Sequence, residues 1–257
     1  MELLKNKTGR KRIKGGDILH FLFIVLLPVA VFVLASQWDL YALAVILILL
    51  SKWRIFAVQP RFWRANVQAN LVDLIFSLGM LNFMYQARGD VWVQAVWMVM
   101  YGAWLVLLKP KSSTAAVTAQ AAVAQAVGLT ALFYFSYQVH DVIIVAGSWL
   151  IAASSARHLI GAYDEEHADF LSATWGLIVA QLAWLLNRWV VVYNIGDHLY
   201  IPQLCVIVII LGYCIAHIYH LAKNGRLNTR QVQYTFGLGG LLLFFVLSIF
   251  SNWSGSI

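Results

Sequence analysis

The chain has 257 residues, of which 61% are hydrophobic and only 11% carry a charge. Soluble globular domains carry about 25% charged residues, so this composition excludes an ordinary soluble fold and indicates a surface that faces lipid. The formal net charge is +7. Because the basic residues stand in short connectors between apolar segments, we attribute the excess to the cytoplasmic side of a membrane protein and not to nucleic-acid binding.

Long apolar segments separated by short polar connectors fill residues 18–250. Crossing the hydrocarbon core takes about 20 apolar residues, and only helices or closed barrels satisfy their backbone groups in lipid. Barrel strands alternate in polarity, and these segments do not. The sequence therefore predicts an all-α fold, a polytopic integral membrane helix bundle with about nine transmembrane helices, of the kind found in a bacterial inner membrane.

Residues 1–17 are expected to form a basic cytoplasmic segment, and residues 18–257 a single transmembrane domain. We expect the spans at about residues 18–35, 38–58, 67–85, 91–108, 114–137, 142–160, 168–192, 201–221 and 232–250. The second span is the weakest, because its uninterrupted apolar stretch covers only residues 40–50. Lys52 and Arg54 must therefore extend their charges toward the headgroups.

The distribution of basic residues predicts the threading. With nine spans, the N-terminal segment and alternate connectors hold sixteen of the eighteen Lys and Arg residues, and only Arg88 and Arg188 fall on the other side. Basic residues concentrate in cytoplasmic loops, so we expect a cytoplasmic N-terminus and an external C-terminus.

The third span carries a polar stripe made of Asn66, Asn70, Asp73 and Ser77. Their spacing places them on one helical face, directed into the bundle or a cytoplasmic vestibule. One interpretation is a solute-binding stripe along a cavity, because an acid inside a span is costly and often functional. The other is that these side chains hold neighbouring helices together.

Small residues four apart indicate close helix packing. The fifth span is rich in them, the sixth also contains several, and we expect these two spans to be neighbours. Gln120 and Gln125 on the fifth span would then be buried and need partners. The small residues concerned are Ala115, Ala119, Ala122, Ala124, Ala126 and Gly128, with Gly237, Gly239 and Gly240 in the ninth span.

The connector after the sixth span, Arg157 to Asp169, gathers acids and histidines among apolar helices. Arg157, Asp164, Glu165 and Glu166 are candidate binding residues. His158 and His167, together with His217 and His220 of the eighth span, are candidate ligands of a divalent metal, because imidazole and carboxylate groups at these spacings can bind one.

Helix capping is the alternative explanation of this connector. Asp164 would cap the seventh span, with Glu165 and Glu166 in its first turn, while His217 and His220 suit the negative end of the eighth. Short connectors place sequential helices side by side, so we expect the eighth span to pack beside the seventh and to bring His217 or His220 close to His158 or His167.

Acids and histidines also recur in the connectors on the external side, where helix caps or a pH-sensitive patch explain them. They are Asp39, Asp90, His140, Asp141, Asp197 and His198. No lysine lies in the middle of a predicted span, which excludes a retinal Schiff base.

Three functions fit these observations. We expect transport of a small solute or ion, or a structural role in a membrane complex. The alternative is a membrane-embedded, metal-dependent enzyme that acts on a lipid-borne substrate at the cytoplasmic face. The expected partners are membrane lipids, with anionic headgroups at that face, and other membrane proteins or a second copy of the chain.

Overall fold

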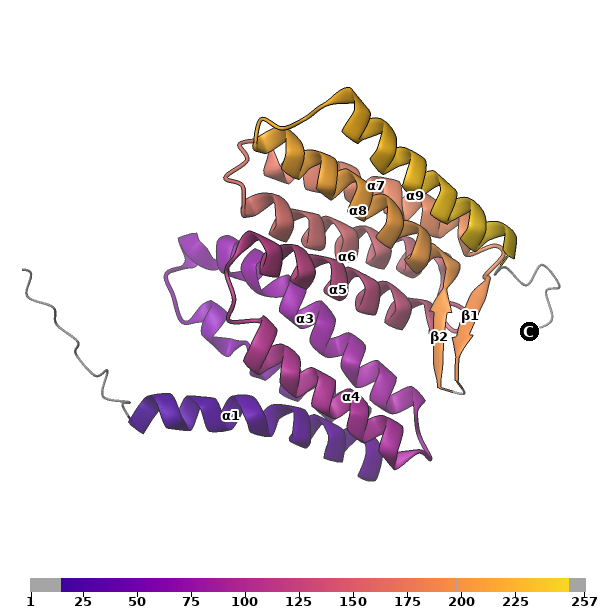
Figure 1. The fold of residues 1–257 in the computed structure, drawn as a ribbon. Helices are drawn as coiled ribbons and strands as arrows, with labels where there is room; N and C mark the ends of the chain where they lie inside the picture. Colours follow the sequence, from indigo (N-terminus) through magenta and orange to yellow (C-terminus); the bar gives the residue numbers. More distant parts are fainter. Residues whose placement is uncertain (1–14, 197, 250–257) are drawn as a thin grey trace, which may run out of the picture.

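The computed structural model describes residues 15–196 and 198–249 and confirms an all-α helical bundle (Figure 1). Within these residues, seven helices are long and apolar enough to cross a membrane. They are Pro60–Gln86 (η3, Pro60–Phe62, continuing as α3, Trp63–Gln86), Val91–Leu108 (α4, Val91–Ala103, continuing as η4, Trp104–Leu108), α5 (Thr114–Phe133), α6 (Asp141–Gly161), α7 (Ala168–Leu186), α8 (Gln203–Lys223) and α9 (Thr229–Ile249).

Two further apolar helices precede these seven. α1 (Gly15–Phe32) continues into the π-helical turn η1 (Val33–Gln37). α2 (Tyr41–Leu50) has only ten residues, and a short 3-10 helix, η2 (Trp53–Phe56), follows it. The predicted span at 38–58 is therefore a half-length helix followed by turns, because its apolar stretch ends at Leu50, where the polar run Ser51–Lys52 begins.

Successive connectors alternate between two ends of the bundle. The connectors around residues 51–62, 109–113, 162–167 and 224–228 share one end, which we call the basic end. There Arg64 at the start of α3 pairs with Asp169 at the start of α7, at 3.3 Å. At the opposite end, the hairpin end, Arg88 pairs with Asp39. These ion pairs join connectors that the predicted threading places on the same side.

A β-hairpin that the sequence analysis missed joins α7 and α8. β1 (Val192–Ile195) and β2 (Leu199–Pro202) pair antiparallel, with Tyr193 opposite Ile201. We expected the seventh span to continue to residue 192 and the eighth to begin at 201, but α7 ends at Leu186. Residues 190–195 are mostly β-branched and aromatic, and Gly196 takes a positive φ of 67° at the turn, so hairpin formation competes successfully with helix.

Glycines mark the closest helix contacts. A Cβ built on Gly176 of α7 would lie 2.9 Å from the backbone oxygen of Trp149 on α6. A Cβ on Gly128 of α5 would lie 2.4 Å from the Ile75 side chain and 3.1 Å from that of Ile151 on α6. The prediction that the fifth and sixth spans are neighbours is therefore confirmed.

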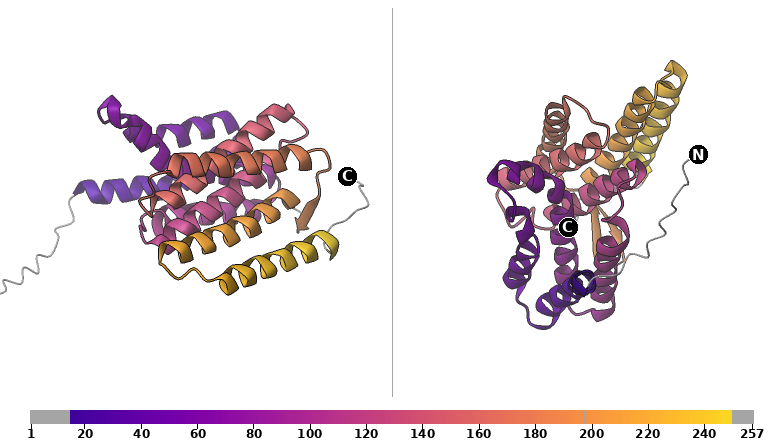
Figure 2. Two further views of the ribbon diagram at one scale, coloured as in Figure 1. Left: turned by 90° about the horizontal axis from the view of Figure 1, so that it is seen from above. Right: turned by 90° about the vertical axis from the view of Figure 1, so that its left-hand side faces the viewer.

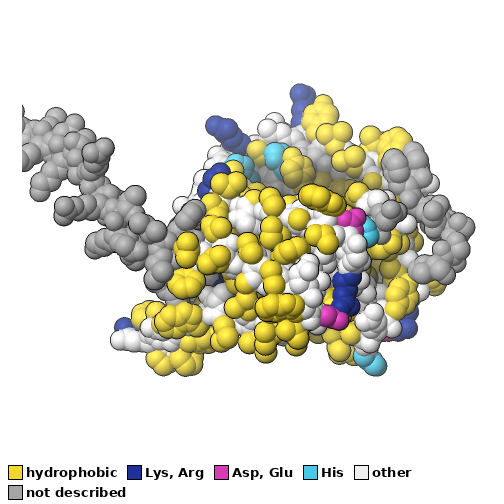
Figure 3. Space-filling view, turned by 90° about the horizontal axis from the view of Figure 1, so that it is seen from below, with side chains coloured by type: hydrophobic (Ala, Val, Ile, Leu, Met, Phe, Trp, Pro, Cys, Tyr) yellow, Lys and Arg dark blue, Asp and Glu magenta, His cyan; other side chains and the backbone are white. Residues whose placement is uncertain are grey.

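α9 lies at the edge of the bundle, beside α8 (Figures 1 and 2). Of its three glycines, Gly239 meets Cys214 of α8, whereas Gly237 and Gly240 have no atom within 4 Å of an added Cβ among the described residues. The expectation of close packing therefore holds for Gly239 alone. Hydrophobic side chains cover much of the face shown in Figure 3, as expected for a surface in contact with lipid.

Candidate functional site

The polar stripe of α3 centres on Asp73, which is only 6% exposed. Lys52 and Lys109 both donate to its Oδ2 atom, Lys109 at 2.5 Å. The indole Nε1 of Trp104 donates to Oδ1 at 3.0 Å. Two cations and an indole therefore satisfy this buried carboxylate.

The end of α2 and the π-helical turn η4, on either side of α3, bring these donors to Asp73. α2 ends at Leu50, so Lys52 lies at the level of Asp73, inside the bundle. The π-helical turn η4, closed by the Lys109 N–H donating to the Trp104 oxygen at 2.9 Å, directs Trp104 onto α3. There the indole stacks on Phe76 with the ring centroids 3.9 Å apart.

The other members of the stripe bond within the protein. Ser77 donates to the Asp73 carbonyl at 2.6 Å, Asn70 to the Asn66 carbonyl at 2.8 Å, and Asn66 to the Ile55 carbonyl at 3.4 Å. The predicted inward orientation is confirmed for Asp73 and Ser77, which are buried. Binding of a solute by the stripe stays a prediction, and the contacts of Asp73 with Lys52, Lys109 and Trp104 favour the alternative in which the stripe holds neighbouring segments together.

In the α6–α7 connector, the predicted capping role of Asp164 is wrong. His167 occupies the N-cap position of α7 and makes no side-chain cap bond. Asp164 lies three residues earlier, exposed, with a positive φ of 49°, and Glu165 and Glu166 also precede the helix. The chain turns sharply here before α7 begins, so these acids cannot occupy its first turn.

Glu165 ties this connector to α8. Its Oε2 accepts from Lys223 at 2.5 Å and from the Tyr219 hydroxyl at 2.6 Å. These two donors lower the pKa of Glu165 from its ordinary value near 4.5 to about 2. The connector and α8 are therefore in contact, through Glu165 and not through a pairing of the histidines that we expected to meet.

Arg157 and Glu166 differ in their surroundings. Arg157 donates to Oδ1 of Asp169 at 2.6 Å, and Arg64 contacts the other carboxylate oxygen. Glu166 is exposed and forms no ion pair within residues 15–196 and 198–249. Arg157 is thus part of an ion-pair network at the basic end, and ligand binding by either residue stays a prediction.

The four candidate metal ligands have separate surroundings. His158 bonds to Gln120 Oε1 at 2.8 Å, and His220 bonds to the Tyr163 hydroxyl at 2.9 Å. His217 stacks on Tyr213 and His167 is exposed. In the part of the chain that the structure describes, no group of three or more His, Cys, Asp or Glu side chains is placed to hold a metal ion. Metal binding stays a prediction.

A cavity of about 670 Å³ lies between α5, α6, α7 and α8 and reaches the basic end. Its volume falls in the range of small-molecule sites. Most of the exposed surface of the lining is apolar. The lining residues that carry polar groups are Thr114, Thr118, Gln125, Ser155, Tyr163, Thr174, Trp175, Tyr213, His217, Tyr219 and His220.

Small residues on α5 leave this space open. Ala115, Thr118 and Ala122 recur at helical spacing and line the cavity. We expected Ala115 and Ala122 to bring another helix close, but both are exposed. α8 is fixed to α5 near the hairpin end, where Cys205 donates to the Ala126 carbonyl at 3.3 Å, and to the α6–α7 connector by His220 at the basic end.

The inner end of the cavity lies near the middle of α5 and α8. Gln125 Oε1 accepts from the Trp175 indole at 3.0 Å, so the predicted burial of Gln125 and its need for a partner are confirmed. Gly212 of α8 faces this pair, and a Cβ added there would lie 3.5 Å from the Trp175 ring and 4.0 Å from Gln125 Nε2. The absence of a side chain at Gly212 therefore keeps the inner end open.

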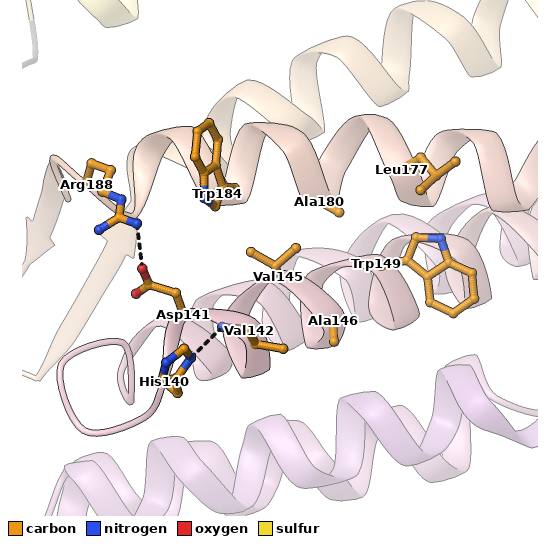
Figure 4. Close-up of a pocket in the computed structure, with 10 residues that line it drawn as sticks. All are labelled: His140, Asp141, Val142, Val145, Ala146, Trp149, Leu177, Ala180, Trp184 and Arg188. Carbon is orange, nitrogen blue, oxygen red and sulfur yellow. Dashed lines mark hydrogen bonds and ion pairs between the residues drawn. The ribbon is translucent and has the colours of Figure 1, made fainter.

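A second hollow, of about 580 Å³, runs between α6 and α7 at the hairpin end (Figure 4). Arg188 pairs with Asp141 at 3.0 Å, and Asn187 donates to the same carboxylate at 3.0 Å. His140 Nδ1 accepts from the Val142 N–H, as a helix cap does. The capping explanation is thus confirmed for His140, and also for Asp90 on α4. Asp197 lies outside the described residues.

Comparison with protein-family models, curated proteins and solved structures gave no match, so the functional argument rests on the residues themselves. The sequence analysis singled out His217 and His220 but not the cavity that they line. The small residues of α5 were the available signal for it. The same spacing of small residues also predicts tight helix packing. Only the position of α8 decides whether these residues pack against another helix or line a cavity.

Proposed function

We propose that this protein binds a lipid-borne small molecule in the cavity between α5 and α8 and carries it as a permease does. The observation that carries the proposal is the mainly apolar cavity of about 670 Å³, whose lining also carries several uncharged polar groups. Small-molecule sites typically combine an apolar lining with a few polar groups. Such a lining matches a molecule with an apolar body and a small polar head.

Access from the bilayer supports this function. Ile178 on α7 and Ile209 on α8 line the cavity, yet they are 40% and 41% exposed. Both belong to helices apolar enough to lie within a membrane. A molecule dissolved in the lipid therefore has a lateral route into the cavity. Gln125 and Gly212 lie near the middle of their helices, the depth at which carriers bind their substrates.

Photolabelling in membranes tests the proposal. A long-chain alcohol with a photoreactive diazirine group should label peptides of α5 and α8, and excess unlabelled alcohol should suppress this labelling. Gly212→Leu places a side chain against Trp175 and Gln125. We expect it to lower the saturable labelling about tenfold, the effect of roughly 1.4 kcal/mol of lost binding.

The matched control is Gly237→Leu on α9, where an added Cβ meets no described atom within 4 Å. This variant should label as the parent protein does. Labelling of α5 and α8 that excess alcohol leaves unchanged would overturn the proposed function. Equal labelling of the two leucine variants would overturn it as well.

We further propose that the basic end faces the cytoplasm of a bacterial cell, where its side chains meet anionic headgroups. Ten Lys and Arg residues from Lys52 onward belong to the connectors and helix termini of this end, against Arg88 and Arg188 at the hairpin end. Such asymmetry indicates the cytoplasmic side. Reporter fusions after residues 111 and 226 should both read cytoplasmic, and a fusion after residue 257 external. If the fusions after residues 111 and 226 report opposite sides of the membrane, this threading is contradicted.

A further inference from the structure

The hollow of about 580 Å³ between α6 and α7 is a groove on the outer surface of the bundle (Figure 4). Its walls are apolar side chains that recur at helical spacing on the two helices. They are Val142, Ala146 and Trp149 of α6 and Leu177, Ala180 and Trp184 of α7. Val142, Leu177 and Trp184 are each more than half exposed. Because α6 and α7 are both long and apolar enough to cross a membrane, the groove faces lipid.

The groove has the length of one bilayer leaflet. From Leu177 to Leu186, where α7 ends, the helix rises about 14 Å, and Arg188 lies just beyond. Half of the hydrocarbon core of a bilayer is about 15 Å thick. The groove therefore runs from the headgroup level at the hairpin end to the middle of the membrane. Ala146 and Ala180 keep its centre open, so it has the shape of a path for an acyl chain.

Polar side chains with unused hydrogen-bond donors lie together at the mouth of the groove (Figure 4). Arg188 pairs with Asp141 at 3.0 Å, and among the described residues its guanidinium has no second partner. A guanidinium carries five N–H donors, so most of them stay available. Nδ1 of His140 accepts from the Val142 N–H, so the ring is uncharged and its Nε2 carries the proton. The mouth thus offers donors from two side chains, while Arg188 and Asp141 balance each other in charge.

Trp184 provides a further donor just inside the mouth. It lies four residues before Arg188, on the same face of the helix and about 6 Å deeper. Within residues 15–196 and 198–249, its indole N–H makes no hydrogen bond. Tryptophan is typical of the membrane interface, where its ring contacts lipid and its N–H reaches polar groups. The ester carbonyls of a phospholipid lie at this depth, directly below the phosphate.

We propose that a phospholipid from the leaflet at the hairpin end binds in this groove. One acyl chain lies between α6 and α7, the phosphate accepts from Arg188 and His140, and an ester carbonyl accepts from the Trp184 indole. Arginine suits this role because its planar group of donors matches the oxygens of a phosphate. The groove and the α5–α8 cavity have no lining residue in common among the described residues, so this proposal does not depend on the proposed function.

Native mass spectrometry of the full chain in detergent tests the proposal, because it counts the lipids bound to each protein. The probe is dioleoyl phosphatidylethanolamine, whose headgroup has no net charge, like the mouth of the groove. The comparison is dioleoylglycerol, which has the same two chains but no phosphate. We expect one phospholipid to bind saturably and about tenfold more tightly than dioleoylglycerol, the effect of charge-assisted hydrogen bonds to the phosphate.

The two arginines of the hairpin end provide a matched pair of variants. Arg188 and Arg88 each pair with an aspartate, but Arg88 does not line the groove. Arg188→Gln should weaken phospholipid binding about tenfold and leave dioleoylglycerol binding unchanged. Arg88→Gln should bind both probes as the parent does. Equal effects of the two variants, or equal binding of the two probes, would show that the mouth does not recognise phosphate and would overturn the proposal.

A second pair of variants tests whether an acyl chain occupies the groove. Ala146 on α6 and Ala103 on α4 are both exposed, but Ala103 lies outside the groove. Ala146→Leu fills the centre of the groove and should weaken the binding of phospholipid and of dioleoylglycerol alike, whereas Ala103→Leu should change neither. If Ala146→Leu binds both probes as the parent does, no chain lies in the groove and the proposal is overturned. Photolabelling of α5 and α8 reports on the other cavity, so either outcome leaves the proposed function to its own test.

Discussion

The two halves of the bundle differ in whether they bury a charged side chain. In α1–α4, Asp73 is charged, and Lys52, Lys109 and Trp104 use both of its oxygens. In α5–α8, the cavity is lined without Lys, Arg, Asp or Glu side chains, and Gln125 at its inner end accepts from the Trp175 indole. One region buries a charge whose partners lie within the chain, and the other encloses a mainly apolar cavity.

This difference shows why charge alone is a poor guide to a functional site inside a membrane protein. A buried charge must be paired during folding, because leaving it unpaired is costly. The residue that stands out most in the sequence, Asp73, is therefore the one whose partners lie within the chain. An uncharged amide can be buried at a lower cost, so a ligand site can form around it.

The largest effect on stability should come from removing the charge of Asp73 in the α1–α4 half. Asp73→Asn leaves Lys52, whose side chain is only 10% exposed, without its counter-charge. Breaking a buried pair costs about 3–5 kcal/mol, so we expect a corresponding loss of free energy of unfolding in detergent. Asp164→Asn, an exposed acid on the α6–α7 connector, should change stability by less than about 0.5 kcal/mol.

The double variant Asp73→Asn/Lys52→Met should recover most of this loss, because it removes both buried charges. Lys109 then remains, and its side chain is 40% exposed and can extend toward water. Thermal and denaturant unfolding of the two variants measure the difference. A double variant as unstable as Asp73→Asn would show that the pair is not what stabilises this region.

An intermediate effect should distinguish tight packing from the open cavity. Gly176→Ala forces a methyl group to 2.9 Å from the backbone oxygen of Trp149, which cannot move away as a flexible side chain would. We expect a loss of about 1–3 kcal/mol. Gly212→Ala places its methyl group at an ordinary contact distance of 3.5 Å from Trp175, and helix propensity favours alanine by about 1 kcal/mol. Unfolding measurements should therefore show opposite signs for the two variants.

The smallest effect should appear only as a pH dependence. Lys223 and Tyr219 lower the pKa of Glu165 to about 2 in the folded protein. The stabilisation is therefore fully present above about pH 4.5 and is lost as the pH falls toward 2. Melting temperatures of the parent and Glu165→Gln, taken from about pH 6 to about pH 3, should converge as the pH falls. Glu166→Gln, on the exposed neighbour that forms no ion pair within residues 15–196 and 198–249, is the control.

Much of the fold could be predicted because its causes are local. The length of the apolar segment predicted both ends of the helix formed by α4 and η4, residues 91–108, and successive connectors lie at alternate ends of the bundle. The inward orientation of Asp73 followed from helical spacing and from the cost of exposing an acid to lipid. The hairpin was missed because its outer residues, 190–192 and 201–202, are apolar enough to resemble the ends of spans, and α2 is half-length because Ser51 and Lys52 end its apolar stretch.

Sequence alone determined that this chain forms a helical membrane bundle, since hydrocarbon leaves an apolar segment few other ways to satisfy its backbone groups. The sequence also shows the small residues of α5, but it does not show which of them contact another helix and which line a cavity. Ala124 and Gly128 lie buried in contacts, whereas Ala115 and Ala122 line an open cavity. Only the tertiary structure decided between these roles, because a helix position becomes a contact or a cavity according to where a distant helix lies, and the attachments of α8 at Cys205 and His220 set its position.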